Sequence, residues 1–485
     1  MELRNWQSEC INLAISKYDE HVKHFLALAT PGAGKTYMAS VLAKQLFELN
    51  KIDLILCFSP SSIVSNDFNY ALSKQFNRRF DGSIGALGNS YTYQGLSSLG
   101  YEVWGLFERY RIFVIFDEIH HCAGSNIHNA NSWGESIITK IKDKAAYTIA
   151  LTGTPWRSDA LPISLAEYSD GLGQVSCNYT YGLKAAIKDK VCRVPSIIVL
   201  DNDNITVAQA GDVTYYSSFF ELLSQSIISY SEIVRNESVI EQLLAKADSK
   251  LNSLRLVNHN AGGLIVASSI SHAWKIQTVL KRVLGEVAYV VTSDENSPNK
   301  IIEKFRNSTN KWIISVGMIS EGTNIPRLQV CCYLSNIKTE MYFRQVLGRI
   351  LRFTRSKNQE ALLFMPAEPK LVEYAHRVSQ DIPQGLADVK FFNMDEKFET
   401  EVTPDNQLMP FKNDLCLLEN KNDELNYDID LQAGMDAADL NIKEASTYER
   451  VMGISGQYKH EMLHIEGFEN LVISEKFIEK LNHYR

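Results

Sequence analysis

The stretch ATPGAGKT occupies residues 29–36, between two segments of different periodicity. The apolar run FLALAT (25–30) leads into it, and TYMASVLAKQLFEL (36–49) follows with apolar residues at helical spacing. A short apolar strand, a Gly-rich turn and an amphipathic helix together form the first part of a strand–helix–strand unit. The stretch therefore predicts an α/β fold built on a parallel sheet.

The same alternation continues along the chain. Further apolar runs end in small or polar residues at LILCFSP (54–60), IFVIFDE (112–118), YTIALTGTP (147–155), GLIVASS (263–269), WIISVG (312–317) and VCCYLSN (330–336). Nearly continuous apolar strands separated by helices are typical of parallel sheets covered on both faces. We expect one α/β domain over 1–172 and a second over 173–385, with a helical insertion at about 215–257. A small C-terminal region of unassigned role follows at 386–485.

Composition excludes several classes of protein. Hydrophobic residues make up 45% of the chain and charged residues 22%, and no apolar run is long enough to cross a bilayer. The eight cysteines form no CxxC pair and the start lacks a secretory signal, so we expect reduced thiols and a cytoplasmic location. The net charge of −8 argues against binding nucleic acid through bulk positive charge, but it leaves local phosphate contacts open.

The Gly-rich turn has the residue types that hold a nucleotide phosphate. Gly32 and Gly34 allow backbone N–H groups to face phosphate oxygens, and the N-terminus of the following helix adds a favourable dipole. Lys35 would reach the β- and γ-phosphates, while the Thr36 hydroxyl would hold Mg²⁺. The candidate nucleotide-binding residues of this loop are Pro31, Gly32, Ala33, Gly34, Lys35 and Thr36.

Two adjacent carboxylates end the strand IFVIFDE. Asp117 would bind Mg²⁺, mostly through water, and Glu118 would orient and deprotonate an attacking water. The nearby His121, Cys122 and His128 raise the alternative of a zinc site. Since no second Cys/His pair lies at a ligand spacing, the two histidines fit better as loop or coupling residues.

With ATPGAGKT, DEIH (117–120) and LTGTP (151–155) in this order, the chain resembles the DExH-box ATPases of helicase superfamily 2. It is most similar to the double-stranded-DNA translocases of repair and to the motor subunits of type I and type III restriction enzymes. The resemblance extends from Arg4 to Arg352. It implies two tandem RecA-like parallel-sheet domains, with ATP as the nucleotide and Mg²⁺ as the metal.

The resemblance also implies roles for residues of the first domain. Gln7 would pair with the edge of the adenine, and Arg4 and Trp6 would pack around the base. His120, the last residue of the DExH pattern, would connect the nucleotide site with LTGTP. The hydroxyls of Thr152 and Thr154 in that segment would link hydrolysis to strand movement.

In the second domain, SVGMISEGTNIP (315–326) and YFRQVLGRILRF (342–353) resemble the family's fifth and sixth motifs. Gly322 and Asn324 would lie at the nucleotide, although the family usually has Asp where Asn324 stands, so a charge is lost there. In a continuous helix Gln345, Arg349 and Arg352 share one face, which would close over the γ-phosphate. The predicted catalytic residues are Lys35, Asp117, Glu118, Gln345, Arg349 and Arg352.

Motors of this pattern hold the phosphates of a strand through hydroxyls, amides and backbone N–H groups. The candidates for such contacts are Ser59, Ser61, Thr92, Gln94, Ser268, Ser269, Ser320 and Thr323. Most are neutral, which agrees with the acidic net charge.

The leading hypothesis is an ATP-dependent DNA helicase or translocase acting in DNA repair, restriction or antiviral defence, with RNA as the other possible strand. One alternative is a motor coupled to a nuclease, since Pro404-Asp405 and Glu419-Asn420-Lys421 are loosely spaced like the PD…ExK pattern. A further alternative is an ATP-dependent recognition switch that does not unwind, with the C-terminal region recruiting a protein partner. The oligomeric state is not predicted.

Overall fold

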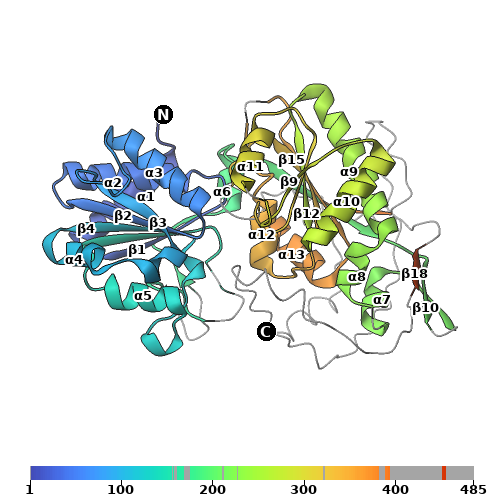
Figure 1. The fold of residues 1–485 in the computed structure, drawn as a ribbon, viewed down its shortest axis with the longest axis horizontal. Coiled ribbons are helices and arrows are strands. Elements are labelled where there is room, and N and C mark those ends of the chain that lie inside the picture. The colour runs from blue at the N-terminus through green and yellow to red at the C-terminus, as the bar shows by residue number, and fades with distance from the viewer. Residues whose placement is uncertain are drawn as a thin grey trace, which may run out of the picture.

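The computed structural model describes residues 2–155, 157, 161–168, 175–209, 212–226, 228–295, 297–319, 323–354, 356–381, 388–393 and 451–454. Two α/β bodies lie side by side, each built on a parallel sheet (Figure 1). The predicted fold class of two tandem RecA-like domains is therefore confirmed.

The first sheet is entirely parallel and has the order β3-β2-β4-β5-β1-β8. Its strands are β1 (His24–Ala29), β2 (Leu54–Ser59), β3 (Gly88–Thr92), β4 (Ile112–Asp117), β5 (Tyr147–Thr152) and β8 (Tyr179–Tyr181). Its helices are α1 (Asn5–Asp19), α2 (Lys35–Glu48), α3 (Ser62–Phe76), α4 (Tyr101–Arg109) and α5 (Ser132–Lys140). Short 3-10 turns follow at η1 (Tyr93–Ser98), η2 (Ile119–His121) and η3 (Ile127–Asn129).

Strand β4 explains why its sequence is apolar without interruption. Phe113 and Ile115 point into a cluster with α1, α2 and α3, whereas Val114 and Phe116 point into a second cluster with α4 and α5. Alternate side chains of a strand lie on opposite faces of its sheet, so both faces of this sheet are buried.

The second sheet is also parallel, in the order β13-β14-β12-β15-β16-β9-β17. Its strands are β9 (Val194–Asp201), β12 (Gly262–Ala267), β13 (Tyr289–Val291), β14 (Trp312–Ser315), β15 (Leu328–Leu334), β16 (Glu360–Pro366) and β17 (Asp388–Asn393). The accompanying helices are α9 (Glu237–Val257), α10 (Ile270–Leu284), α11 (Pro298–Arg306), α12 (Glu340–Leu347) and α13 (Pro369–Gln380).

At three places, paired strands lie on opposite sides of an expected domain limit. Strand β8 follows residue 172 but pairs with β1 of the first sheet, and β17 follows residue 385 but pairs with β9. In the insertion, α7 (Phe219–Gln225), α8 (Tyr230–Arg235) and α9 are helical as expected. An unexpected hairpin of β10 (Ile205–Gln209) and β11 (Asp212–Tyr216) precedes them and pairs with β18 (Val451–Ile454) from the C-terminal region. A two-stranded ribbon of β6 (Glu167–Tyr168) and β7 (Val175–Ser176) was not expected either.

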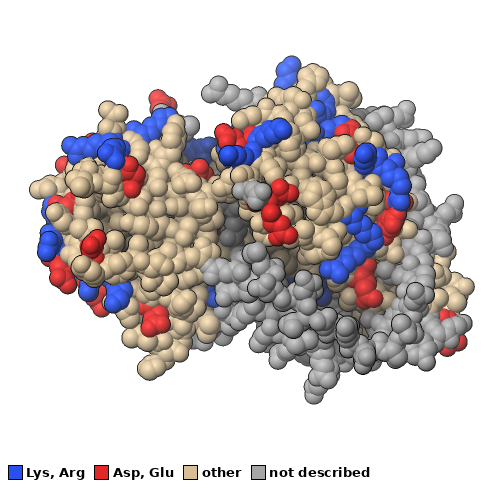
Figure 2. Space-filling view, in the orientation of Figure 1, with Lys and Arg blue, Asp and Glu red and all other residues tan. Residues whose placement is uncertain are grey.

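Positive and negative side chains are mixed on the visible surface of both bodies (Figure 2). In Figure 2, Lys and Arg lie among Asp and Glu, and wide uncharged areas separate them. Within the described part of the chain, no helix is long and apolar enough to cross a membrane.

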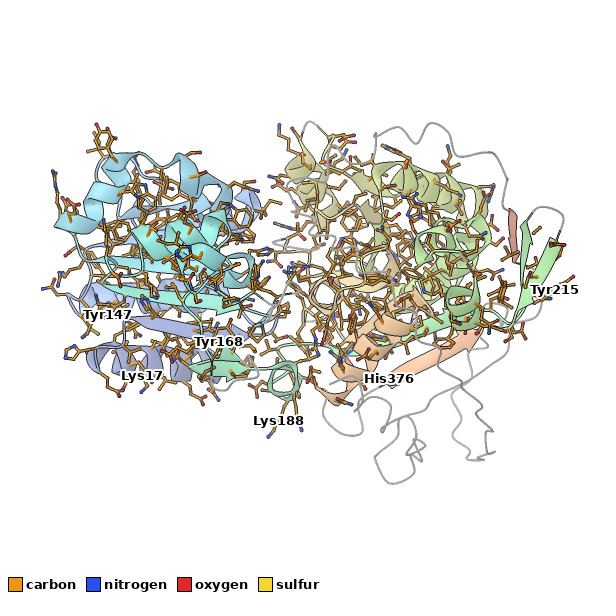
Figure 3. The ribbon with its side chains drawn as sticks, turned by 90° about the horizontal axis from the view of Figure 1, so that it is seen from below. Lys17, Tyr147, Tyr168, Lys188, Tyr215 and His376 are labelled. Atoms are coloured by element: carbon orange, nitrogen blue, oxygen red, sulfur yellow. The ribbon has the colours of Figure 1, made fainter. Side chains whose placement is uncertain are left out.

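A buried arginine ties the segment that connects the domains to the second sheet. Helix α6 (Leu183–Lys188), marked by Lys188 in Figure 3, lies between the two bodies, and Arg193 follows it at 1% exposure. Its guanidinium donates five hydrogen bonds, three of them to the carbonyl oxygens of Leu328, Ile350 and Pro326 at 2.5, 3.1 and 3.2 Å. One side chain thus joins the segments that carry Asn324 and Arg349.

We expect Arg193→Met to lower the free energy of unfolding of the second domain by about 3 kcal/mol, because several buried carbonyl oxygens lose a charged donor. The midpoint of urea unfolding measures this loss. Arg282→Met is the control, since the Arg282 side chain is 53% exposed and pairs with Glu237 and Glu241 at the surface. It should change stability by no more than about 1 kcal/mol. Equal losses in both variants would contradict the role of Arg193.

Candidate active site between the two domains

The Gly-rich turn joins the end of β1 to the start of α2. Gly32 and Gly34 have φ angles of +82° and +96°, a region that L side chains rarely adopt. The backbone conformation therefore favours glycine there, and a Cβ atom on Gly34 would also displace Nε2 of Gln7, which would lie 2.9 Å away. The turn thereby places Lys35 at the first position of α2, as the sequence predicts.

Lys35 and Glu118 form an ion pair across the carboxyl edge of the first sheet. The Nζ atom of Lys35 lies 2.8 Å from Oε1 of Glu118, and the Gly153 N–H donates to Oε2 at 3.2 Å. Burial alone would raise the pKa of Glu118, but the Lys35 ammonium, His120 and these hydrogen bonds outweigh it and lower the pKa to about 2. Glu118 is therefore ionised at neutral pH and pairs with Lys35.

The residues expected around the adenine contact the Gly-rich turn. Arg4 Nη1 donates to the Ala33 carbonyl at 2.6 Å, and Gln7 Nε2 donates to the Gly34 carbonyl at 3.0 Å. The Gln7 carbonyl oxygen accepts from the Arg4 N–H at 2.9 Å. Trp6 is different from the expectation, because it is 2% exposed and stacks on Tyr181 at 4.8 Å, which removes it from any base.

His120 lies at the centre of a buried polar network. Its Nδ1 atom is 2.9 Å from Thr152 Oγ1 and 3.4 Å from Thr154 Oγ1, and the Thr154 N–H donates to Thr152 Oγ1 at 3.0 Å. Its Nε2 atom lies 3.5 Å from Nε2 of Gln345 in the second domain. The predicted coupling residues therefore form one chain of contacts from the carboxylates to the opposite domain.

The arginines of the second domain reach the same place, but not on one helix. Helix α12 ends at Leu347, and Arg352 lies in a β-bridge with Cys192. The expected continuous helix is thus wrong, because α12 ends before Arg349 and Arg352. A Cβ atom added at Gly348 would lie 2.7 Å from Pro31 Cβ. Arg349 Nη1 donates to the Thr323 carbonyl at 3.0 Å, and Arg352 donates to the Asn324 side-chain oxygen.

A cavity of about 410 Å³ lies between the two domains and brings together most of the residues predicted for the nucleotide site. Its lining includes Arg4, Pro31, Gly32, Gly34, Lys35, Thr36, Asp117, Glu118, Thr154, Asn324, Gln345, Arg349 and Arg352. Gly322 and Ser320 lie outside the described residues. The Thr36 hydroxyl and the Asp117 carboxylate are oxygen donors on one wall, a donor set that suits Mg²⁺.

The lining residues that were not singled out from the sequence include Tyr37, Asp67 and Phe353. Tyr37 and Phe353 directly follow the predicted site residues Thr36 and Arg352, so their position in the sequence could have pointed to them. Asp67 had none, since only the packing of α3 brings it to the cavity. Burial raises the pKa of Asp67, while Arg306 and Arg352 oppose that shift.

The candidate strand contacts divide by exposure. Ser59 and Thr323 are buried and donate to backbone carbonyls, so neither hydroxyl reaches a strand in this arrangement. Ser61, Thr92 and Ser269 accept backbone N–H groups at the starts of α3, η1 and α10. Ser268 contacts His272, and Gln94 is exposed.

The described residues provide no geometric support for the metal-cluster or the nuclease alternative. Among the described residues, no three His, Cys, Asp or Glu side chains come together as metal ligands. Cys122 is instead buried in the core beside Tyr93, where burial raises the pKa of its thiol above the ordinary range. The segment 403–421, with its PD…ExK spacing, lies outside the described residues.

Comparison with known proteins places these features in a family. Residues 1–157 match the model of the res subunit of type III restriction enzymes. An uncharacterized protein of Mycobacterium leprae is 30% identical over 414 residues, which cover 79% of this chain and 67% of that protein. A relative from Mycobacterium tuberculosis is 29% identical over 77% of this chain, and the match spans 62% of its own length.

Two more distant proteins agree with these matches. The DNA 3'-5' translocase XPB2 of Sulfurisphaera tokodaii is 22% identical over 75% of this chain and 81% of its own. A fragment of a type I restriction HsdR subunit from Vibrio vulnificus has the same fold, with a TM-score of 0.55, 15% identity and coverage of 81% and 69% of the two chains. Taken with the two parallel-sheet domains and the cavity between them, these matches place the chain in superfamily 2 of the helicase and translocase ATPases.

Proposed function

We propose that the chain is a DNA-dependent ATPase that couples ATP hydrolysis to movement along DNA or to remodelling of it. The observation that carries the proposal is the interdomain cavity, where Lys35 and Glu118 of the first domain face Gln345 and Arg349 of the second. A site completed by two domains changes their relative position when its ligand binds or is hydrolysed. The printed function of the archaeal relative, a DNA translocase, supports DNA as the strand.

The residues of the cavity suit the hydrolysis of a phosphoanhydride. Lys35 would exchange its contact with Glu118 for the β- and γ-phosphates, which frees that carboxylate to deprotonate a water. Thr36 and Asp117 would hold Mg²⁺, which when bound supplies positive charge to the phosphates. Arg349 would stabilise the negative charge that develops on the transferred group. Arg4 and Gln7 would hold the base, through the turn that they already contact.

Movement would follow from the contacts between the domains. A series of side-chain contacts connects the carboxylate that would act on water with the second domain. It runs from Glu118 through His120 to Gln345. The accessible strand contacts that we propose are Ser61, Thr92, Gln94, Ser268 and Ser269, with Ser320 outside the described residues. Opening and closing of the cavity would shift the two sets of contacts relative to each other along one strand.

The proposal is tested by ATPase rates without nucleic acid and with single-stranded DNA, duplex DNA, forked DNA and RNA. We expect DNA to raise the rate, and Lys35→Ala to remove hydrolysis because the phosphates lose their cation. Unchanged hydrolysis in Lys35→Ala would refute the assignment of the site. If only RNA raised the ATPase rate, the nucleic acid that the protein acts on would be RNA and not DNA. Displacement of a triplex without separation of a duplex would identify translocation rather than unwinding.

A further inference from the structure

A buried tyrosine lies between two of the proposed strand contacts and touches the catalytic edge of the sheet. Tyr93 is the first residue of η1, directly after Thr92 and before Gln94, and its side chain is fully buried. Its hydroxyl donates to the main-chain carbonyl of Asp117 at 2.8 Å. Its ring stacks on Trp133 of α5 with centroids 5.7 Å apart.

The carbonyl that Tyr93 holds belongs to the peptide that joins Asp117 to Glu118. Glu118 has a φ of +50°, a left-handed conformation that is unfavourable for a residue with a side chain. Such a conformation persists only where the surroundings hold it. A hydrogen bond to the preceding carbonyl restrains the rotation of this peptide and, with it, the direction of the Glu118 side chain.

Tyr93 is suited to this restraint because its proton stays in place. Burial raises the pKa of the phenol well above its ordinary value, and the carboxylates of Asp117 and Glu118 act in the same direction. The hydroxyl is thus a permanent donor. The stacking on Trp133 fixes the ring, so a shift of η1 is transmitted to the hydroxyl rather than absorbed by a rotation of the side chain.

The other end of this connection is open to a strand. Gln94 is exposed, and Thr92 is partly exposed at the start of η1. Tyr93 stands between them in the chain, and so a strand that moves η1 also moves the group that holds the Asp117 carbonyl. No other residue needs to change conformation between the strand contact and the peptide of Glu118.

We propose that Tyr93 is a positioning residue that transmits the binding of DNA at Thr92 and Gln94 to the orientation of Glu118. This inference rests on the proposed function, since it concerns how the strand regulates the same ATPase site. The Tyr93 hydroxyl touches neither the nucleotide cavity nor the surface, so its effect on turnover acts through the Asp117–Glu118 peptide.

The test compares Tyr93→Phe with Tyr18→Phe. Tyr18 is 1% exposed in the same domain and its hydroxyl donates to the Thr148 carbonyl of β5 at 2.9 Å, so both changes remove one buried hydroxyl from one backbone acceptor. Tyr18 packs on Tyr147, which Figure 3 shows at the end of the first domain remote from the second. A general loosening of the domain would affect both variants alike.

We expect the ratio of DNA-stimulated to unstimulated ATPase rate to fall about fivefold in Tyr93→Phe, the effect of one lost neutral hydrogen bond, and to stay at the wild-type value in Tyr18→Phe. The affinity for DNA without nucleotide should not change, because Thr92 and Gln94 remain. Equal ratios in the two variants overturn the inference. If the wild type itself shows no stimulation by any nucleic acid, the proposed function fails instead.

A second measurement does not depend on turnover. Coupling between two sites is reciprocal, so a non-hydrolysable ATP analogue should change the affinity of the wild type for DNA. The change should be smaller in Tyr93→Phe than in Tyr18→Phe, with thermal unfolding midpoints that show both variants to be folded. The same analogue effect in both variants overturns the inference.

Discussion

The Glu118→Gln protein is expected to hydrolyse ATP about 10³-fold more slowly than the wild type while it continues to bind ATP, because the variant keeps the shape of the site but loses its base. Glutamine retains an oxygen that accepts the Gly153 N–H. It cannot take a proton from water, and it carries no charge to pair with Lys35. Steady-state ATPase rates together with the affinity for a fluorescent ATP analogue measure the two effects separately.

Glu135→Gln provides the matched control for this prediction. Glu135 is an exposed carboxylate in the first turn of α5, in the same domain but without a contact to the cavity. Its substitution should leave the ATPase rate within about twofold of the wild type, as surface changes usually do. A Glu118→Gln protein that retains the rate of Glu135→Gln would exclude Glu118 as the base.

The ion pair with Lys35 would make the base strength of Glu118 depend on whether a nucleotide is bound. While Lys35 contacts Glu118, it contributes to the low pKa of the carboxylate, and a carboxylate of low pKa is a weak base. Transfer of the ammonium to a phosphate removes that contribution, so the pKa rises and the base strengthens. The geometry thereby favours proton abstraction after a nucleotide has arrived.

The order of the strands could not be read from the sequence, although their existence could. The runs FLALAT and IFVIFDE predict buried parallel strands because both faces of each strand need apolar residues. Strand β8 was missed because Tyr179–Tyr181 is three residues long and has no apolar run. Its place beside β1 depends on pairing with a residue far away in the chain, and local sequence does not encode such pairing.

The residues that line the cavity were predicted more completely than the residues that hold them in place. Lys35 and Glu118 were singled out by residue types that suit phosphate chemistry, and Arg349 by the resemblance to the family's sixth motif. Arg193 and Tyr93 stand in no such motif, and their contacts join segments distant in the chain. The end of α12 at Leu347 was also missed.

Replacement of Arg349 by Ala is expected to lower the DNA-stimulated ATPase rate by about 10³-fold, because an arginine that faces the transferred phosphate stabilises charge that appears only in the transition state. The side chain is 8% exposed, lines the cavity and donates to the Thr323 carbonyl at 3.0 Å, so it is held from within its own domain. The affinity for ATP should change much less than the rate.

Arg344→Ala separates this role from the general effect of a lost cation in the same segment. Arg344 precedes Gln345 on α12, but its guanidinium pairs with Glu340 at 2.9 Å and with Asp381 at 2.6 Å, both within the second domain. Its removal should affect stability more than turnover. Arg349→Lys should stay near the rate of Arg349→Ala, since an ammonium lacks the planar fork of the guanidinium. If Arg344→Ala and Arg349→Ala lowered the ATPase rate equally, Arg349 would contribute to the fold of this segment and would not supply a charge to the phosphate.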